Sequence, residues 1–354
     1  MYRILEGDVT EQLKTLADES VQCMITSPPY WGLRDYGVKG QLGLEKTPEE
    51  YIAKMVAVFR EVRRVLRGDG TCWINMGDSY ASGKGTCYNP GGGTNSLGQE
   101  RKAAGAHPLD RGNKSTLAAV GLKSKDLVGI PWMPAFALRT NGWYLRQDII
   151  WAKPNPMPES VTDRCTKSHE YLFLLTKSAR YFYDAGAIKE PAVTDDMRRP
   201  YTSEGAWQLD GRPVEQRHGG QIRTTGNKTH KLVAEYERSD SEEHRTAAGL
   251  LKIAETAYAT RNKRSVWTIA TQPFKEAHFA TFLEKLVEPC ILAGSRTGDT
   301  VLDCFAGSGT TGAMALRHGR NFIGIELNPE YAAMARRRIE TDAPLFNKAA
   351  NSKQ

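Results

Sequence analysis

Two short stretches of this chain combine residue types that could hold and modify a small molecule. The first is TSPPYW at residues 26–31, directly after the apolar run VQCMI. The two prolines fix the backbone at the mouth of a predicted strand, while Tyr30 and Trp31 supply flat aromatic faces. This combination suggests a site that holds a planar group.

The second stretch is AGSGTTG at residues 306–312, between two predicted strands that each end near a carboxylate, Asp303 and Glu326. A glycine turn that leads into a helix offers backbone N–H groups to a negative group of a ligand, and a carboxylate after the following strand can accept ribose hydroxyls. A nucleotide-like ligand is expected, although a turn used only for packing would also be rich in glycine. The spacing is not GxGxxG, which disfavours a nicotinamide dehydrogenase.

The elements that must position these residues alternate between strand and helix. YRILEGD at residues 2–8 is predicted to form a short strand, and Thr10 is expected to cap a helix that carries Leu13 and Leu16. VQCMI is the next strand. Strands, helices and short connections in this order indicate an α/β fold with a doubly wound, mostly parallel sheet.

A long amphipathic helix is predicted between the strand at 21–25 and the strand TCWINMGD at 71–78. Thr47 is its expected N-cap, Pro48 its first residue and Glu50 the partner that closes a capping box. Gly68 and Gly70 are expected to stop it. The aromatic segments 142–158 and 169–184 are strand candidates that complete the sheet.

Two polar segments interrupt this pattern. Residues 81–125 hold nine glycines and seven Lys or Arg against two acidic residues. They suggest a mobile basic loop, either a plain surface insertion or a flap that orders on a phosphate backbone. Residues 190–264 are also polar, and they are interpreted as an insertion from the main sheet.

Composition narrows the class of protein. The 354 residues carry 48 Lys and Arg against 41 Asp and Glu, a net charge of +7 that suits a polyanionic partner. The six cysteines are scattered without a CxxC pair, so neither a disulfide scaffold nor a zinc site is indicated. No signal peptide or membrane-spanning run is recognisable, and a soluble cytoplasmic protein is expected.

The chain resembles the DNA amino-methyltransferases, which move a methyl group from S-adenosylmethionine to the exocyclic amine of cytosine or adenine. TSPPY matches the catalytic motif (D/N/S)PP(Y/F/W), and DCFAGSGTT matches the cofactor motif DxFxGSGT. NFIGIE and EAHFATFLEKLVEPCI match companion motifs. The catalytic motif comes first, which is the permuted order of the beta class.

The resemblance implies a circularly permuted, seven-stranded methyltransferase sheet. Residues 1–189 would form the catalytic half, 190–264 a target-recognition insertion and 265–345 the cofactor half, with a tail at 346–354. Since only one helix follows Glu326, the strand at 2–8 would supply the next strand of the sheet. That would place Asp8 beside the adenine of the cofactor, and the alternative for Asp8 is a plain turn residue.

The resemblance also assigns roles to residues. The implied catalytic residues are Ser27, Pro28, Pro29 and Tyr30. The implied cofactor-binding residues are Asp8, Phe279, Asp303, Phe305, Gly307, Ser308, Gly309, Thr310 and Glu326. No metal is implied.

The TSPPYW stretch suits the chemistry of an exocyclic amine. Such an amine is a poor nucleophile, and in a duplex it must be extruded. Carbonyls near the prolines and the Ser27 hydroxyl can accept hydrogen bonds from the amine and favour a tetrahedral nitrogen. Tyr30 offers a stacking face, with help from Trp31. Ser27, in place of the aspartate common in adenine enzymes, favours cytosine-N4.

Several alternatives stay open. They are adenine-N6 as the target, an RNA or protein-glutamine methyltransferase, and a DNA-binding relative without activity. Double-stranded DNA is the expected partner, with or without a cognate restriction endonuclease, and no membrane partner is expected. Lys153 and Asn155 could meet phosphate or base or only end a Pro-rich strand, His169 is expected to be packed, and the basic runs at 198–199 and 261–264 fall in the insertion.

Overall fold

The computed structural model describes residues 1–32, 36–81, 87–88, 121–191, 260–271 and 282–342. The chain divides into two compact units. The larger unit comprises Met1–Ile188 and Arg264–Gln354, and the smaller comprises Lys189–Lys263.

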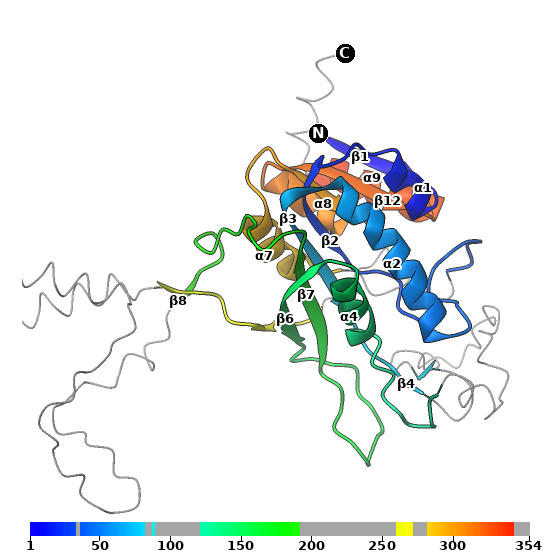
Figure 1. The fold of residues 1–354 in the computed structure, drawn as a ribbon. Helices are drawn as coiled ribbons and strands as arrows, with labels where there is room; N and C mark the ends of the chain where they lie inside the picture. Colours follow the sequence, from blue (N-terminus) through cyan, green and yellow to red (C-terminus); the bar gives the residue numbers. More distant parts are fainter. Residues whose placement is uncertain (33–35, 82–86, 89–120, 192–259, 272–281, 343–354) are drawn as a thin grey trace, which may run out of the picture. The chain divides into compact units, whose positions relative to one another are not determined.

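A sheet of eight strands lies at the centre of the larger unit, in the order β1-β12-β11-β2-β3-β7-β6-β10 (Figure 1). Its strands are β1 (Tyr2–Glu6), β2 (Val21–Thr26), β3 (Leu66–Met76), β6 (Tyr144–Ala152), β7 (His169–Thr176), β10 (Val266–Thr268), β11 (Thr300–Asp303) and β12 (Asn321–Glu326). Every pair is parallel except the two that β7 makes, with β3 and with β6.

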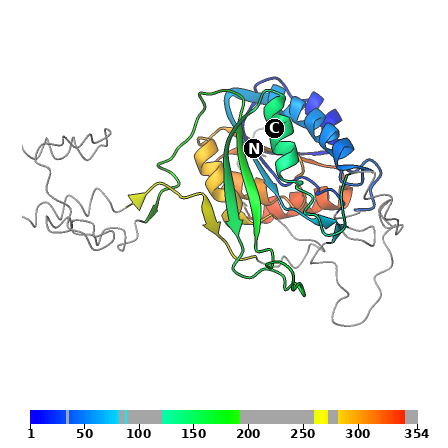
Figure 2. The same ribbon diagram turned by 60° about the horizontal axis from the view of Figure 1, so that its bottom comes forward.

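Helices cover both faces of this sheet (Figures 1 and 2). One face carries α1 (Val9–Lys14), α2 (Pro48–Val65) and α4 (Trp132–Thr140), and the other carries α7 (Glu284–Gly294), α8 (Thr310–Arg317) and α9 (Pro329–Asp342). The central strand β2 is buried at all six positions, as expected for a parallel strand covered on both faces. Met24 belongs to the hydrophobic core on the face that carries α1, α2 and α4. Its neighbour Ile25 belongs to the core on the face that carries α7, α8 and α9.

The doubly wound, mostly parallel sheet predicted from the sequence is confirmed. So is the placement of the first strand, because β1 pairs in parallel with β12 from Tyr2–Phe322 to Glu6–Glu326. The sheet has one strand more than the seven expected. The extra strand, β10, extends the edge beyond β6, where the Trp267 side chain is buried.

Two helix boundaries differ from prediction. The α2 helix begins as expected, with Thr47 accepting from the Glu50 N–H, but it ends at Val65. Leu66 is already extended and buried, so Gly68 and Gly70 lie inside β3 and do not stop the helix.

The N-cap of α1 also differs, because it is Asp8 and not Thr10. The Asp8 carboxylate accepts hydrogen bonds from the N–H groups of Thr10 and Glu11. Leu16 lies just beyond the helix, which ends at Lys14, and its side chain is still buried.

The remaining described strands are short. β4 (Tyr80–Ala81) pairs with β5 (Cys87–Tyr88), and in the smaller unit β8 (Glu190–Pro191) pairs with β9 (Thr260–Arg261). Most of the 81–125 loop and of the 190–264 insertion, and all of the 346–354 tail, lie outside the described residues. Among the helices that are described, none is long and apolar enough to cross a membrane.

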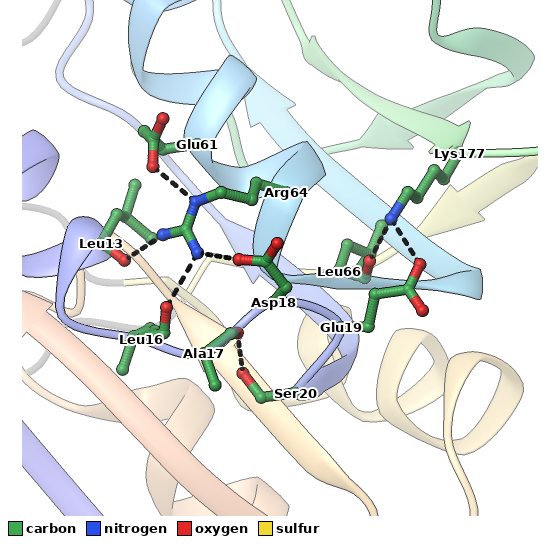
Figure 3. A network of polar contacts seen from close by, with 10 residues as sticks. All are labelled: Leu13, Leu16, Ala17, Asp18, Glu19, Ser20, Glu61, Arg64, Leu66 and Lys177. Atoms are coloured by element: carbon green, nitrogen blue, oxygen red, sulfur yellow. Dashed lines mark hydrogen bonds and ion pairs between the residues drawn. The ribbon is translucent and has the colours of Figure 1, made fainter.

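Arg64, near the end of α2, connects α2 by hydrogen bonds to α1 and to the loop after α1 (Figure 3). Its guanidinium donates to the carbonyls of Leu13 at 2.8 Å and Leu16 at 2.9 Å, and also to the carboxylates of Asp18 and Glu61. The last carbonyls of a helix lack partners within the helix, so Arg64 acts as a C-terminal cap supplied by another element.

Replacing Arg64 by alanine should therefore lower the free energy of unfolding by about 1–3 kcal/mol, because two part-buried carbonyls lose a charged donor, although the Leu13 carbonyl keeps the Leu16 N–H. Urea denaturation followed by circular dichroism measures this. Arg67→Ala is the matched control, since among the described residues that side chain makes one exposed pair, with Asp69, and its loss should change stability by less than about 0.5 kcal/mol. Equal losses in the two variants would contradict the capping role.

Candidate active site

The TSPPYW turn lies at the carboxyl end of β2, in the middle of the sheet. In doubly wound sheets ligands bind at this end of the strands. Pro28 is buried, while Ser27, Pro29 and Tyr30 are partly exposed. The turn is thus a rigid segment with one accessible side.

The segment 43–51 is hydrogen-bonded to this turn. The Tyr51 hydroxyl, in α2, donates to the Pro29 carbonyl at 2.9 Å, and the Trp31 indole N–H donates to the Glu45 carbonyl at 2.9 Å. The Pro29 oxygen is therefore already engaged. Among the described residues the Pro28 carbonyl has no protein partner, so it is an acceptor that the turn can offer, as is the Ser27 hydroxyl.

Tyr30 is fixed at both its ring and its hydroxyl. The hydroxyl lies 2.9 Å from Glu170 Oε2 on β7, 3.4 Å from Asn75 Oδ1 on β3 and 3.5 Å from Ser27 Oγ. The ring packs on Gly77, where an added Cβ would come within 2.9 Å of it. The sequence therefore leaves room for the ring by placing glycine after β3.

Asp303 is a buried carboxylate at the end of β11, just before the glycine turn. Its Oδ1 accepts from the Phe305 N–H at 3.1 Å, and its Oδ2 accepts from the Thr311 hydroxyl at 2.6 Å. Oδ1 also accepts from the Thr26 hydroxyl at 2.6 Å. Loss of solvent on burial raises the pKa of this carboxyl to about 6, against the opposing effect of these hydrogen bonds.

The Thr26–Asp303 hydrogen bond brings the two predicted motifs together. Thr26 immediately precedes Ser27, and Asp303 ends the neighbouring strand β11. Residues that are 277 positions apart in sequence thus share one short contact. The turn with the proline pair and the glycine turn form one site at the carboxyl edge of the sheet.

Glu326 ties the end of β12 to the same site. Its carboxylate accepts from the Gly307 N–H at 2.8 Å and from the Asn328 N–H at 2.9 Å. Burial raises its pKa, and these backbone donors oppose the shift. Gly307 itself has φ +51°, and the nearest atom to an added Cβ would be 4.0 Å away, so the backbone is open to a ligand there.

The other residues of the glycine turn face inward. The Ser308 and Thr310 hydroxyls contact the Arg338 guanidinium at 3.3 and 2.8 Å. Gly309, with φ +79°, touches the α9 backbone at Ala335. Phe305 packs against the core. Each hydroxyl accepts from Arg338 and keeps its own O–H as a donor, and the cofactor roles of Ser308 and Thr310 stay predictions.

Asp8 and Phe279 complete the predicted set. Asp8 is exposed at the start of α1, two residues after the end of β1, and its Oδ1 makes the capping hydrogen bonds. It is thus a cap residue with a second oxygen available, and adenine recognition stays a prediction. Phe279 lies outside the described residues.

The structure also defines the contacts of four other residues that the sequence singled out. Trp31 is buried in the core, so it cannot stack on a ligand as expected. Lys153 forms an ion pair with Glu170. Asn155 bonds the Thr271 backbone, as the end of a strand would. His169 packs edge-on against Tyr171, and burial lowers its pKa.

Sequence reasoning missed Asn75 and Glu170, which surround Tyr30. The available signal was a polar side chain in each of two strands rich in apolar residues, WINM and HEYLFLL. Buried polar groups need partners, so each could have been marked as part of a hydrogen-bonded site.

Comparisons with known proteins agree with this geometry. The family model for DNA methylases of the N6/N4 type matches residues 21–337. The chain belongs to this DNA methylase family. It is 40% identical over 343 residues to the type II methyltransferase M.Cfr9I of Citrobacter freundii, covering 95% of this chain and 87% of that protein. It is 42% identical over 337 residues to M.XycI of Xanthomonas campestris pv. cyanopsidis, with the same coverage.

Solved structures share the fold of this DNA methylase at lower identity. PvuII DNA methyltransferase, described as cytosine-N4-specific, matches with a TM-score of 0.52 and 18% identity over 99% of this chain and 93% of that one. A putative DNA modification methylase of Thermus thermophilus, TTHA0409, complexed with S-adenosyl-L-methionine, matches with a TM-score of 0.51 and 21% identity over 98% and 97%.

Proposed function

We propose that this DNA methylase transfers a methyl group from S-adenosylmethionine to N4 of a cytosine extruded from double-stranded DNA. The hydrogen bond from Thr26 to Asp303 carries the proposal, because it joins the SPPY turn to the glycine turn of the cofactor motif. An amine acceptor and a methyl donor would then meet at one edge of the sheet.

The chain's own contribution is positioning. The Pro28 carbonyl and the Ser27 hydroxyl would each accept one N–H of the base amine, which leaves the nitrogen lone pair free to attack. Tyr30 would stack on the base. Holding the nitrogen and the methyl carbon in line accounts for most of the acceleration in such a one-step displacement.

The residues present fit S-adenosylmethionine, which supplies an electrophilic methyl group when bound. The Gly307 N–H already donates to Glu326, but the space beside Gly307 and the N-terminus of α8 would suit the carboxylate of the amino-acid end. Glu326 lies at the end of β12, where ribose hydroxyls are accepted in related folds. Asp8, after β1, would form a hydrogen bond with the adenine of the cofactor.

Ser27 supports cytosine over adenine. A neutral hydroxyl is a weaker acceptor than the aspartate common in adenine enzymes. The PvuII enzyme, described as cytosine-N4-specific, has the same fold. The same turn could serve the adenine amine, so the base is the finer part of the proposal.

Mass spectrometry of nucleosides can identify the base that is methylated. DNA copied by a polymerase, and so free of methylation, is incubated with enzyme and labelled cofactor. We expect label in N4-methylcytosine. Label in N6-methyladenine alone would overturn the choice of base, and label in neither would count against the activity.

Cofactor binding can be tested through Glu326. Glu326→Ala should weaken S-adenosylmethionine binding about 2- to 10-fold in calorimetry, the usual effect of one lost hydrogen bond. Glu330→Ala, in the exposed first turn of α9, is the control and should bind as the unmodified protein does. Unchanged affinity in Glu326→Ala would remove this residue from the cofactor site.

A further inference from the structure

A hydrogen-bonded chain connects Ser27 to a charged pair on the neighbouring strands. The Ser27 hydroxyl lies 3.5 Å from the Tyr30 hydroxyl, which lies 2.9 Å from Glu170 Oε2. The other oxygen of Glu170 pairs with Lys153. Three elements contribute: the turn after β2, the first half of β7 and the residue after β6.

The charge of Glu170 sets the direction of this chain. A carboxylate is only an acceptor, so the Tyr30 proton must point toward it. The Lys153 ammonium pairs with the other oxygen of Glu170, and both side chains are less than a fifth exposed, at 19% and 17%. The Tyr30 oxygen can then offer only its lone pairs to Ser27.

Asn75 fixes the orientation of Glu170 from the other side. Its amide donates to Glu170 Oε2 at 3.2 Å and to the Tyr171 carbonyl at 3.1 Å, so the donating nitrogen faces the carboxylate. Its oxygen lies 3.4 Å from the Tyr30 hydroxyl. That hydroxyl has one proton, and the charged acceptor at 2.9 Å attracts it more strongly.

The consequence reaches the reacting amine. A serine hydroxyl can be donor or acceptor, but the amine of a base needs an acceptor. We propose that Glu170 is a positioning residue which acts through Tyr30 to turn the Ser27 O–H away from the amine, so that the Ser27 lone pairs face it. This inference rests on the proposed function, and it explains how a neutral serine can serve at this position.

The test uses single-turnover methyl transfer to polymerase-copied DNA. Glu170→Gln keeps the shape and removes the charge, and Tyr30→Phe keeps the stacking ring and removes the relaying hydroxyl. Each should lower the rate about 10-fold, as expected for losing one orienting hydrogen bond to a charged group, with unchanged affinity for cofactor and DNA. Combining the two should lower the rate no further than either alone, because both break the same chain.

The same two substitutions are then made in a Ser27→Ala protein, which gives the decisive comparison. Once the hydroxyl is absent, Glu170→Gln and Tyr30→Phe should have no further effect on the rate. Glu159→Gln is the matched control, since Glu159 is another buried carboxylate paired with a cation, Arg164, but lies outside the chain of hydrogen bonds. It should leave the rate unchanged, whereas a general effect of losing a buried pair would lower it.

The outcomes separate this inference from the function. If the unmodified protein labels no base, the proposed function and the inference both fall. If it labels DNA and Glu170→Gln or Tyr30→Phe transfers at the same rate, the inference alone is overturned. If Glu170→Gln does not fold, Tyr30→Phe with and without Ser27→Ala still decides, and additive losses in that pair would overturn the proposal.

Discussion

Asp303→Ala is expected to destabilise the protein by on the order of 3–5 kcal/mol, because three donors lose one buried charged acceptor. The donors are the hydroxyls of Thr26 and Thr311 and the Phe305 N–H. The glycine turn should lose its shape as well, so cofactor binding should fall in the variant that still folds. Urea denaturation and calorimetry measure the two effects.

Asp303→Asn is the matched variant. The asparagine oxygen can keep the two donors that Oδ1 has, and its NH₂ can donate to the Thr311 hydroxyl, so the loss should be much smaller than for alanine. A loss as large as that of alanine would show that charge, and not hydrogen bonding, holds the turn.

The stability of the protein should also depend on pH through the carboxyl group of Asp303. Since the pKa of Asp303 in the folded state is about 6 and that of an unfolded aspartate is about 3.9, the folded protein binds the proton more tightly. Its stabilising contribution is therefore fully present below about pH 4 and is lost as the pH rises through about 6. Relative to Asp303→Asn, the unmodified protein should lose about 2–3 kcal/mol between pH 4 and 7. A flat difference across this range would contradict the raised pKa.

Tyr30→Ala should lower the single-turnover rate of methyl transfer about 5- to 150-fold, because base–aromatic stacking is worth about 1–3 kcal/mol per base. The change should appear in transfer and in DNA binding but leave cofactor affinity intact, since the side chain faces Glu170 and Asn75 and not the glycine turn.

Tyr144→Ala controls for the loss of a tyrosine in general. Tyr144 begins β6 and is 47% exposed, so its removal should leave both rate and stability close to those of the unmodified protein. A Tyr30→Ala protein with an unchanged rate would argue that the base stacks elsewhere.

The parts of the site that could be predicted from sequence are those made by consecutive residues. The SPPY and AGSGTT turns follow directly from local chemistry, and the parallel strands around them follow from alternating strand and helix patterns. Glu170 could not be placed, because its contact with Tyr30 spans 140 residues and depends on the antiparallel register of β3 and β7. Nothing local in HEYLFLL fixes that register.

The differences in the helices have equally specific causes. Glycines at 68 and 70 normally end a helix, but Leu66 pairs with Val21 and is buried, so the sheet begins before the glycines are reached. At α1, Asp8 and Thr10 are both good caps, and the position of Gly7, hydrogen-bonded to the Glu326 carbonyl, selects the earlier one.

The pairing of β1 with β12 has a consequence for how the chain folds. Met1 contacts Asn321, 320 residues away along the sequence, and β1 has no other neighbour in the sheet that the structure describes. While the polypeptide is still being synthesised, the first strand has no partner until β12 has left the ribosome. Closing so long a loop is entropically unfavourable and slow. Residues 2–6 are thus expected to dock only after β12 is available, and until then the short length of this strand limits its pairing with other chains.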